Sequence, residues 1–101
     1  MNASLTKIDL GYNNIGDEGG KAIGEALKVN TSLTRIDLNS NEIGDEGGMA
    51  IGEALKVNTS LTELDFCLDM GNKVGFEGRK AIVEALTVNT SCEWTNHLLD
   101  F

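Results

Sequence analysis

The sequence predicts an α/β fold built as a solenoid, in which short strand–turn–helix units stack side by side. Two observations point to it: residues 32–59 nearly copy residues 4–31, and a more divergent third copy occupies residues 60–90. Self-similarity at a fixed period marks a repeat architecture, because each unit buries its apolar face against its neighbours. A third observation is the change of hydrophobic period within each copy, from alternation to helical spacing. We expect a single domain, residues 1–101, that ends in a degenerate tail or cap at residues 91–101.

Each unit begins with a predicted strand. In the first copy, Ile8 and Leu10 point to one side of the strand while Lys7 and Asp9 point to the other, since side chains alternate along a strand. The same alternation recurs in the other two copies. Each strand therefore has one face for the core and one face for solvent or a partner.

A helix follows each strand. After Gly16 the apolar residues take helical spacing, as in A-I-G-E-A-L at residues 22–27. Asp17 is the predicted N-cap, because its side chain can accept hydrogen bonds from the first free N–H groups of a helix. V-N-T at residues 29–31 ends the helix. In the third copy Phe76 replaces this aspartate, which predicts a weaker start for the third helix.

Stacking such units predicts a curved array. Strands lie about 4.8 Å apart in a sheet, whereas neighbouring helices need about 10 Å. The strands must therefore lie on the inside of the curve. Glycines inside a helix weaken it by up to about 1 kcal/mol each. We interpret the repeated glycines as positions of close approach between elements: Gly19, Gly20, Gly24, Gly47, Gly48 and Gly52.

The motif L-x-x-I-x-L-x-x-N-x-I-G-D-E-G resembles the leucine-rich repeat, in the 28-residue form of ribonuclease-inhibitor-like proteins. The resemblance covers residues 4–90 in three registered copies. It implies a right-handed α/β horseshoe with parallel strands on the concave face and helices on the convex face. It also implies a ladder of inward-facing asparagines that bond to the backbone of neighbouring turns, here Asn13, Asn41 and Asn72. Buried polar side chains need such partners.

The side chains that point away from the helices would form columns along the concave face. The predicted partner-binding residues are Lys7, Asp9, Tyr12, Arg35, Asp37, Ser40, Glu63, Asp65 and Cys67. The column of three aspartates favours a basic protein partner, although aspartate could also be an inherited consensus residue at this position. Tyr12 is the strongest single anchor, because tyrosine is enriched among interface hot spots. Cys67 is expected to be exposed at the concave rim.

Composition narrows the class of function. The net charge of −8 argues against nucleic acid or a membrane surface as partner, since both attract Lys and Arg. No segment approaches the ~18 consecutive apolar residues of a membrane span, and no secretory signal is recognisable. We therefore expect a cytoplasmic protein with Cys67 and Cys92 as free thiols. With one histidine, His97, and no acid–base pair, nucleophile or metal cluster, the sequence predicts no enzymatic activity and no cofactor.

The repeat pattern breaks in two places. Three extra residues precede Gly75 at the predicted strand exit, and they form either a binding loop or the product of drift. In E-W-T-N-H, residues 93–97, the strand pattern is predicted to stop, so residues 91–101 either fold back as a cap or fray. No cap precedes the first copy, which predicts a longer array or end-to-end self-association.

The leading function is a non-catalytic protein–protein interaction module, and we expect the chain to be a fragment of a longer array. The resemblance implies it, because ribonuclease-inhibitor-like arrays bind other proteins on their concave or rim surfaces. Two alternatives stay open at this level. One is an accessory regulator of a partner enzyme, similar to a GTPase activator, and the other is a purely structural repeat fragment.

Overall fold

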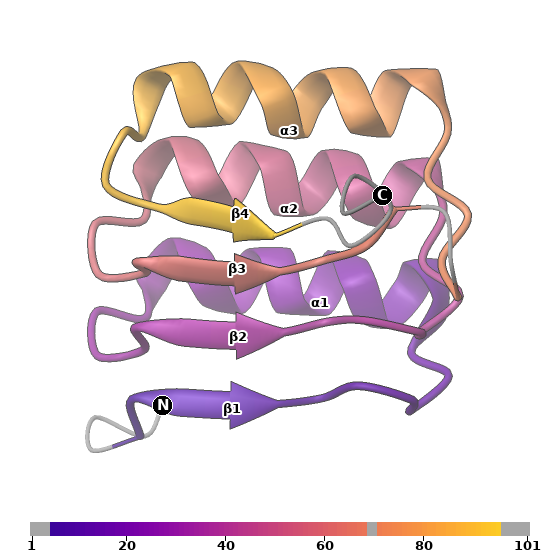
Figure 1. The fold of residues 1–101 in the computed structure, drawn as a ribbon, viewed down its shortest axis with the longest axis horizontal. Coiled ribbons are helices and arrows are strands. Elements are labelled where there is room, and N and C mark those ends of the chain that lie inside the picture. The colour runs from indigo at the N-terminus through magenta and orange to yellow at the C-terminus, as the bar shows by residue number, and fades with distance from the viewer. Residues whose placement is uncertain (1–4, 69–70, 96–101) are drawn as a thin grey trace.

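In the computed structural model, which describes residues 5–68 and 71–95, four short strands and three helices alternate along the chain (Figure 1). They are β1 (Lys7–Asp9), α1 (Gly16–Val29), β2 (Arg35–Asp37), α2 (Asp45–Val57), β3 (Glu63–Asp65), α3 (Phe76–Val88) and β4 (Glu93–Thr95). The strands form one parallel sheet in the order β1-β2-β3-β4. The helices cover one face of this sheet and are spaced more widely than the strands (Figure 1). The predicted α/β solenoid is thus confirmed.

The strands pair in the register that the repeat predicts. Ile8 lies beside Ile36, Ile36 beside Leu64, and Leu64 beside Trp94. These side chains point toward the helices, and the residues on either side of them point away. The core fills the space between sheet and helices. Its fully buried members include Leu38, Ile43, Ile51, Leu55, Leu61, Leu64, Phe66, Leu68 and Ile82.

The strand pattern continues at Glu93–Thr95, which corrects the prediction that it stops there. This segment forms β4, and the N–H of Glu93 donates to the carbonyl of Thr62 at 2.8 Å. The chain is one residue shorter between the third helix and this strand than in earlier copies, so Trp94 takes the position of the strand isoleucine. Its indole Nε1 donates to the carbonyl of Phe66 at 2.9 Å. The rest of the predicted tail or cap, residues 96–101, lies outside the described residues.

Asp17 caps the next helix, and the prediction that it caps its own helix is wrong. Its Oδ1 accepts hydrogen bonds from the N–H groups of Gly44 and Gly47, both at 2.8 Å. Asp45 repeats the contact by accepting from the N–H of Gly78 at 3.0 Å. These N–H groups lie at the starts of α2 and α3, where helix donors lack internal partners and a negative charge is favourable. Capping is therefore an interaction between repeats.

Phe76 therefore does not deprive its own helix, α3, of a capping carboxylate, contrary to the prediction. The start of α3 still receives a carboxylate, because that carboxylate comes from Asp45 in the preceding repeat. The side chain of Phe76 is 73% exposed. It stands where an aspartate would reach forward to a further helix.

Two glycines bring the helices close together, as predicted. A Cβ atom at Gly24 would lie 2.8 Å from the carbonyl oxygen of Ala50. A Cβ atom at Gly52 would lie 2.9 Å from the carbonyl carbon of Ala81. Both distances are shorter than real Cβ contacts allow, so a side chain at either position would push neighbouring helices apart.

A row of asparagines ties the strand exits together. Asn41 is fully buried; its Nδ2 donates to the carbonyls of Leu10 and Asn39 at 2.8 and 3.2 Å, and its Oδ1 accepts from the N–H of Asn13 at 2.8 Å. Asn72 makes the equivalent bonds one repeat later. Asn13 makes only bonds within its own turn, because its exposed side chain donates to the carbonyls of Leu10 and Gly11 at 2.9 and 3.2 Å, so the predicted bond from Asn13 to a neighbouring turn is not observed. Among the described residues, no earlier turn lies beside it.

A second row of asparagines ties the helix ends together. Asn58 Nδ2 donates to the carbonyls of Leu27 and Asn30 at 2.8 and 3.1 Å. Asn89 repeats this contact with two carbonyls of the second repeat, both at 3.0 Å. The sequence signal for this row was the recurrence of N-T-S at the end of every helix. Asparagine side chains therefore bond to backbone carbonyls of the preceding repeat at both the strand exits and the helix ends.

Candidate protein-binding face

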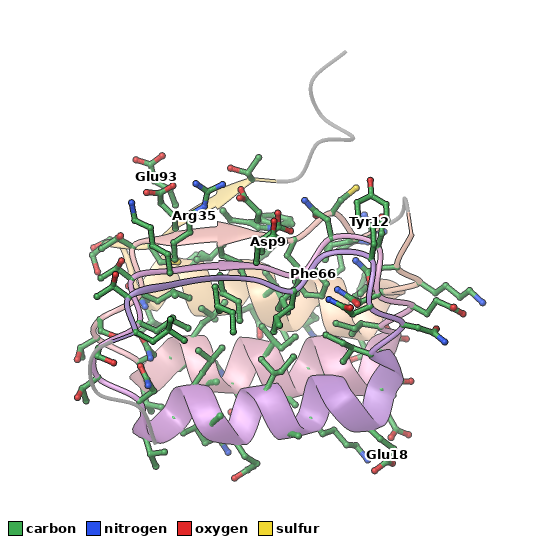
Figure 2. The ribbon with its side chains drawn as sticks, turned by 90° about the horizontal axis from the view of Figure 1, so that it is seen from below. Asp9, Tyr12, Glu18, Arg35, Phe66 and Glu93 are labelled. Carbon is green, nitrogen blue, oxygen red and sulfur yellow. The ribbon has the colours of Figure 1, made fainter. Side chains whose placement is uncertain are left out.

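The sheet face opposite the helices carries the predicted columns of polar side chains. Strand pairing places Lys7, Arg35, Glu63 and Glu93 in one column and Asp9, Asp37, Asp65 and Thr95 in the next. In Figure 2, Asp9, Arg35 and Glu93 lie on the strand side, whereas Glu18 projects from the helix side. Sequence reasoning missed the fourth member of each column, because the shortened connection before β4 hid its register.

Arg35 joins the two columns across β2 and β3. Its Nη2 lies 2.7 Å from Asp65 Oδ2, and its Nε lies 3.8 Å from Glu63 Oε2. The hydrogen bond to Asp65, with the charges of Asp65 and Glu63, raises the pKa of Arg35. Such a solvent-screened pair adds little to stability. Its main effect is to occupy the one cation that β2 contributes to this face.

Asp9 and Asp37 each shape the exit of their strand. Asp9 Oδ1 accepts from the N–H of Gly11, and Asp37 Oδ1 accepts from the N–H of Asn39, both at 2.9 Å. This short-range bond is the usual way in which aspartate stabilises a turn. The two carboxylates therefore have a structural role in addition to the charge that they bring to the concave face.

Tyr12 lies just beyond the strands. It is 85% exposed and projects on the same side as Asp9 and Arg35 (Figure 2). Its φ is 61°, and that of Ser40, the equivalent residue one repeat later, is 57°. Ser40 is partly covered because Gly71 packs closely against it. A Cβ atom on Gly71 would lie 2.5 Å from the Cα of Ser40. Of the two equivalent positions, only the tyrosine offers a large accessible side chain.

Cys67 is buried, which corrects the expectation of an exposed thiol on the concave rim. It is only 3% exposed, and its N–H donates to Asn39 Oδ1 at 2.7 Å. The next residue, Leu68, is also buried, and its carbonyl accepts the N–H of Val74 at 3.0 Å. The described part of the insertion therefore adds to the core, while residues 69–70 lie outside the described residues.

A shallow hollow of about 290 Å³ lies on this face between β1 and β2. It is lined by Lys7, Ile8, Asp9, Arg35 and Asp37. Charged side chains of both signs around the backbone of two strands suit contact with a polar segment of another protein. The hollow contains no nucleophile paired with a base, which is what covalent catalysis would require.

Within residues 5–68 and 71–95, no three His, Cys, Asp or Glu side chains are grouped so that they could hold a metal ion. In the same part of the chain, no helix combines the length and apolar character needed to cross a bilayer.

We expect the Cys92 thiol to react slowly in the folded protein. Burial, with a smaller effect of the nearby Glu93 carboxylate, raises its pKa from 9.0 to about 11. Because the thiolate is the nucleophile, the reactive fraction at pH 8 falls about a hundredfold relative to the unfolded chain. The favourable contribution of the neutral thiol to folding is complete below pH 9 and is lost as the pH rises through 11.

Alkylation of a Cys67→Ala variant, which leaves Cys92 as the single thiol, measures this rate with and without urea. Raising the pH from 8 to 10 should increase the alkylation rate of the folded protein in proportion to the rise in its thiolate fraction. Equal rates in the folded and unfolded protein would show that Cys92 is not protected.

The repeat also matches a known protein family. The family profile described as Leucine Rich repeat matches residues 2–24 and 29–52. The parallel sheet with its outer layer of helices agrees with that match. The chain therefore has a short α/β solenoid fold of the leucine-rich-repeat type, and its first two repeats match the family profile.

A solved structure supports the same conclusion. The chain is similar to the structure named Leiomodin-1 Actin-Binding Site 2 (ABS2), with a TM-score of 0.80 and 29% sequence identity. The match covers 95% of this chain and 55% of the leiomodin chain, so the present chain spans about half the length of its structural neighbour. No curated protein matches the sequence.

Proposed function

We propose that the chain is a protein-binding module and that its concave face holds a basic segment of a protein partner. The observation that carries this proposal is the charge of the strands. Five outward side chains on β1–β4 are acidic and two are basic. Arg35 is already paired with Asp65, so the face keeps a negative balance that would attract a cationic segment.

The structural neighbour supports a protein as the partner. Its name describes an actin-binding site, which makes actin the first candidate to test. The charge pattern makes a lysine- and arginine-rich peptide the second. An arc of four short strands offers a small contact surface, so we expect a weak or transient complex in either case.

We further propose that the repeats are of the ribonuclease-inhibitor-like form, that the module works in the cytoplasm and that it does not itself catalyse a reaction. The 28-residue period and the L-x-x-I-x-L-x-x-N motif support the first point. Two free cysteines support a reducing compartment. The polar concave face, which lacks a catalytic pair in its hollow, supports the third.

The test is a binding titration of the fluorescently labelled chain with actin and, separately, with a lysine- and arginine-rich peptide. Tyr12→Ala should weaken binding at least about fivefold, since truncating an interface hot spot costs more than ~1 kcal/mol. Asp37→Asn removes the charge but keeps an acceptor for the Asn39 N–H, so its effect isolates electrostatics. Higher salt should weaken the peptide complex.

The matched control is Glu18→Gln on the helix side, which removes one charge far from the strands (Figure 2). Its binding should equal that of the wild type. Binding that depends on Glu18 but not on Tyr12 or Asp37 would place the interface on the convex side. Failure of both probes to bind would remove the support for a basic or actin-like partner.

A further inference from the structure

The outer edge of β1 has unpaired backbone groups in a regular pattern. The N–H of Leu10 donates to the carbonyl of Asp37 at 2.9 Å, and the N–H of Arg35 donates to the carbonyl of Thr6 at 3.1 Å. Backbone groups alternate along a strand, so residues 6, 8 and 10 face β2 while Lys7 and Asp9 face outward. No other strand pairs with this edge among the described residues (Figure 1).

An apolar hollow of about 170 Å³ lies beside the same edge. Its lining includes Leu5, Ile8 and Leu10 from the first strand segment and Ile23 and Leu27 from α1. The matching residues of the second repeat are buried beneath the first repeat. The surface at β1 therefore has the composition of an interface between repeats, and no repeat within residues 5–68 and 71–95 covers it.

We propose that two copies of this chain join through their β1 edges as an antiparallel, two-fold symmetric pair. Centring the pair on Ile8 places Lys7 of one copy opposite Asp9 of the other, and the reverse. Because the peptide groups of Lys7 and Asp9 both face outward, each such pair can exchange two backbone hydrogen bonds. The side chains of each pair lie on the concave face with opposite charges, a favourable cross-strand arrangement. Ile8 then meets its own copy on the core side.

The other end of the stack does not fit a head-to-tail alternative equally well. In the first two repeats, three residues engage the following helix: the capping aspartate and two glycines of close approach, Asp17, Gly20 and Gly24 in the first repeat. The corresponding residues of the third repeat are Phe76, Arg79 and Val83. The side chains of Phe76 and Val83 are exposed on α3. They would obstruct a further helix placed as close to α3 as α2 lies to α1. A closed two-fold dimer avoids this end.

Sedimentation equilibrium of the 101-residue chain tests the proposal. The wild type should show a monomer–dimer equilibrium that stops at the dimer. Lys7→Asp and Asp9→Lys should each weaken the dimer at least about tenfold, because two symmetry-related attractive pairs become repulsive. The double variant, Lys7→Asp with Asp9→Lys, exchanges the charges within each pair and should restore the wild-type constant.

The double variant also separates the two arrangements. In a head-to-tail stack, strand order would set position 7 beside Glu93, so Asp at position 7 would stay unfavourable and the double variant would not recover. Glu93→Lys is the control and should leave the two-fold dimer unchanged. Circular dichroism confirms that each variant is folded, since Asp9→Lys also loses the bond to the Gly11 N–H. Wild-type chain that stays monomeric up to about 1 mM, or that forms species beyond the dimer, overturns the proposal.

Discussion

Replacing Asn72 with leucine should destabilise the protein by about 3–6 kcal/mol, a large part of the roughly 5–15 kcal/mol that stabilises a typical domain. The Asn72 carboxamide accepts from the N–H groups of Asn41 and Ile43 at 3.1 and 2.9 Å. It donates to the carbonyls of Leu38 and Cys67 at 3.2 and 2.9 Å. All four backbone groups would lose a partner in a site where the side chain is only 2% exposed. Urea unfolding followed by far-ultraviolet circular dichroism measures the loss.

Asn13→Leu is the matched control, because Asn13 has the same place in the motif but an exposed side chain. Its amide bonds two carbonyls of its own turn, both open to water, so we expect a loss below about 1 kcal/mol. Similar losses for the two variants would mean that the asparagine side chain stabilises its own turn and that the contact between repeats contributes little.

The parts of the fold that could be predicted are those set by the period of the chain. A 28-residue copy places equivalent residues side by side, so the register of Ile8 with Ile36 follows from sequence alone. The alternation of side chains along a strand likewise predicts which residues face outward. Both features follow from the sequence of one repeat and from its period. Neither depends on the detailed contacts between repeats.

Contacts between repeats were harder to predict. Local helix rules assign Asp17 to the helix that contains it, whereas its carboxylate reaches the start of α2. The same rules miss Asn58, whose partners are carbonyls in the first repeat. In both cases the sequence shows that a polar residue recurs, but only the stacking of the repeats shows which backbone groups it meets.

Small changes in length account for the errors at the candidate site. The insertion in the third repeat changes the alternation after β3, and Cys67 turns into the core although its repeat position suggested the rim. The connection before β4 is one residue shorter than in the earlier copies. A comparison of the copies at a fixed period therefore misses this strand, although its pairing places Trp94 beside Leu64. Side-chain direction in a strand reverses with every one-residue shift. The direction of these side chains therefore could not be predicted from the repeat pattern alone.

Phe66→Ala should cost about 3–5 kcal/mol, the usual loss for removing a buried phenylalanine side chain. The Phe66 side chain is 0% exposed and lies between the sheet and the helices (Figure 2). Its N–H donates to the carbonyl of Thr95 at 3.0 Å, and its carbonyl accepts from Trp94 Nε1. Both bonds use backbone atoms that alanine retains, so the measured loss reports packing and the cavity left behind. The same urea titration gives the change in unfolding free energy.

Phe76→Ala is the matched control in the same repeat. Its side chain is exposed on α3 and touches no following repeat among the described residues, so truncation should change stability by no more than about 0.5 kcal/mol. The pair distinguishes two departures from the repeat pattern that look alike in sequence, since each puts phenylalanine where the first two copies have another residue. A large loss from Phe76→Ala, with little from Phe66→Ala, would mean that the exposed face of α3 is buried in solution and that the third repeat does not end the helix stack.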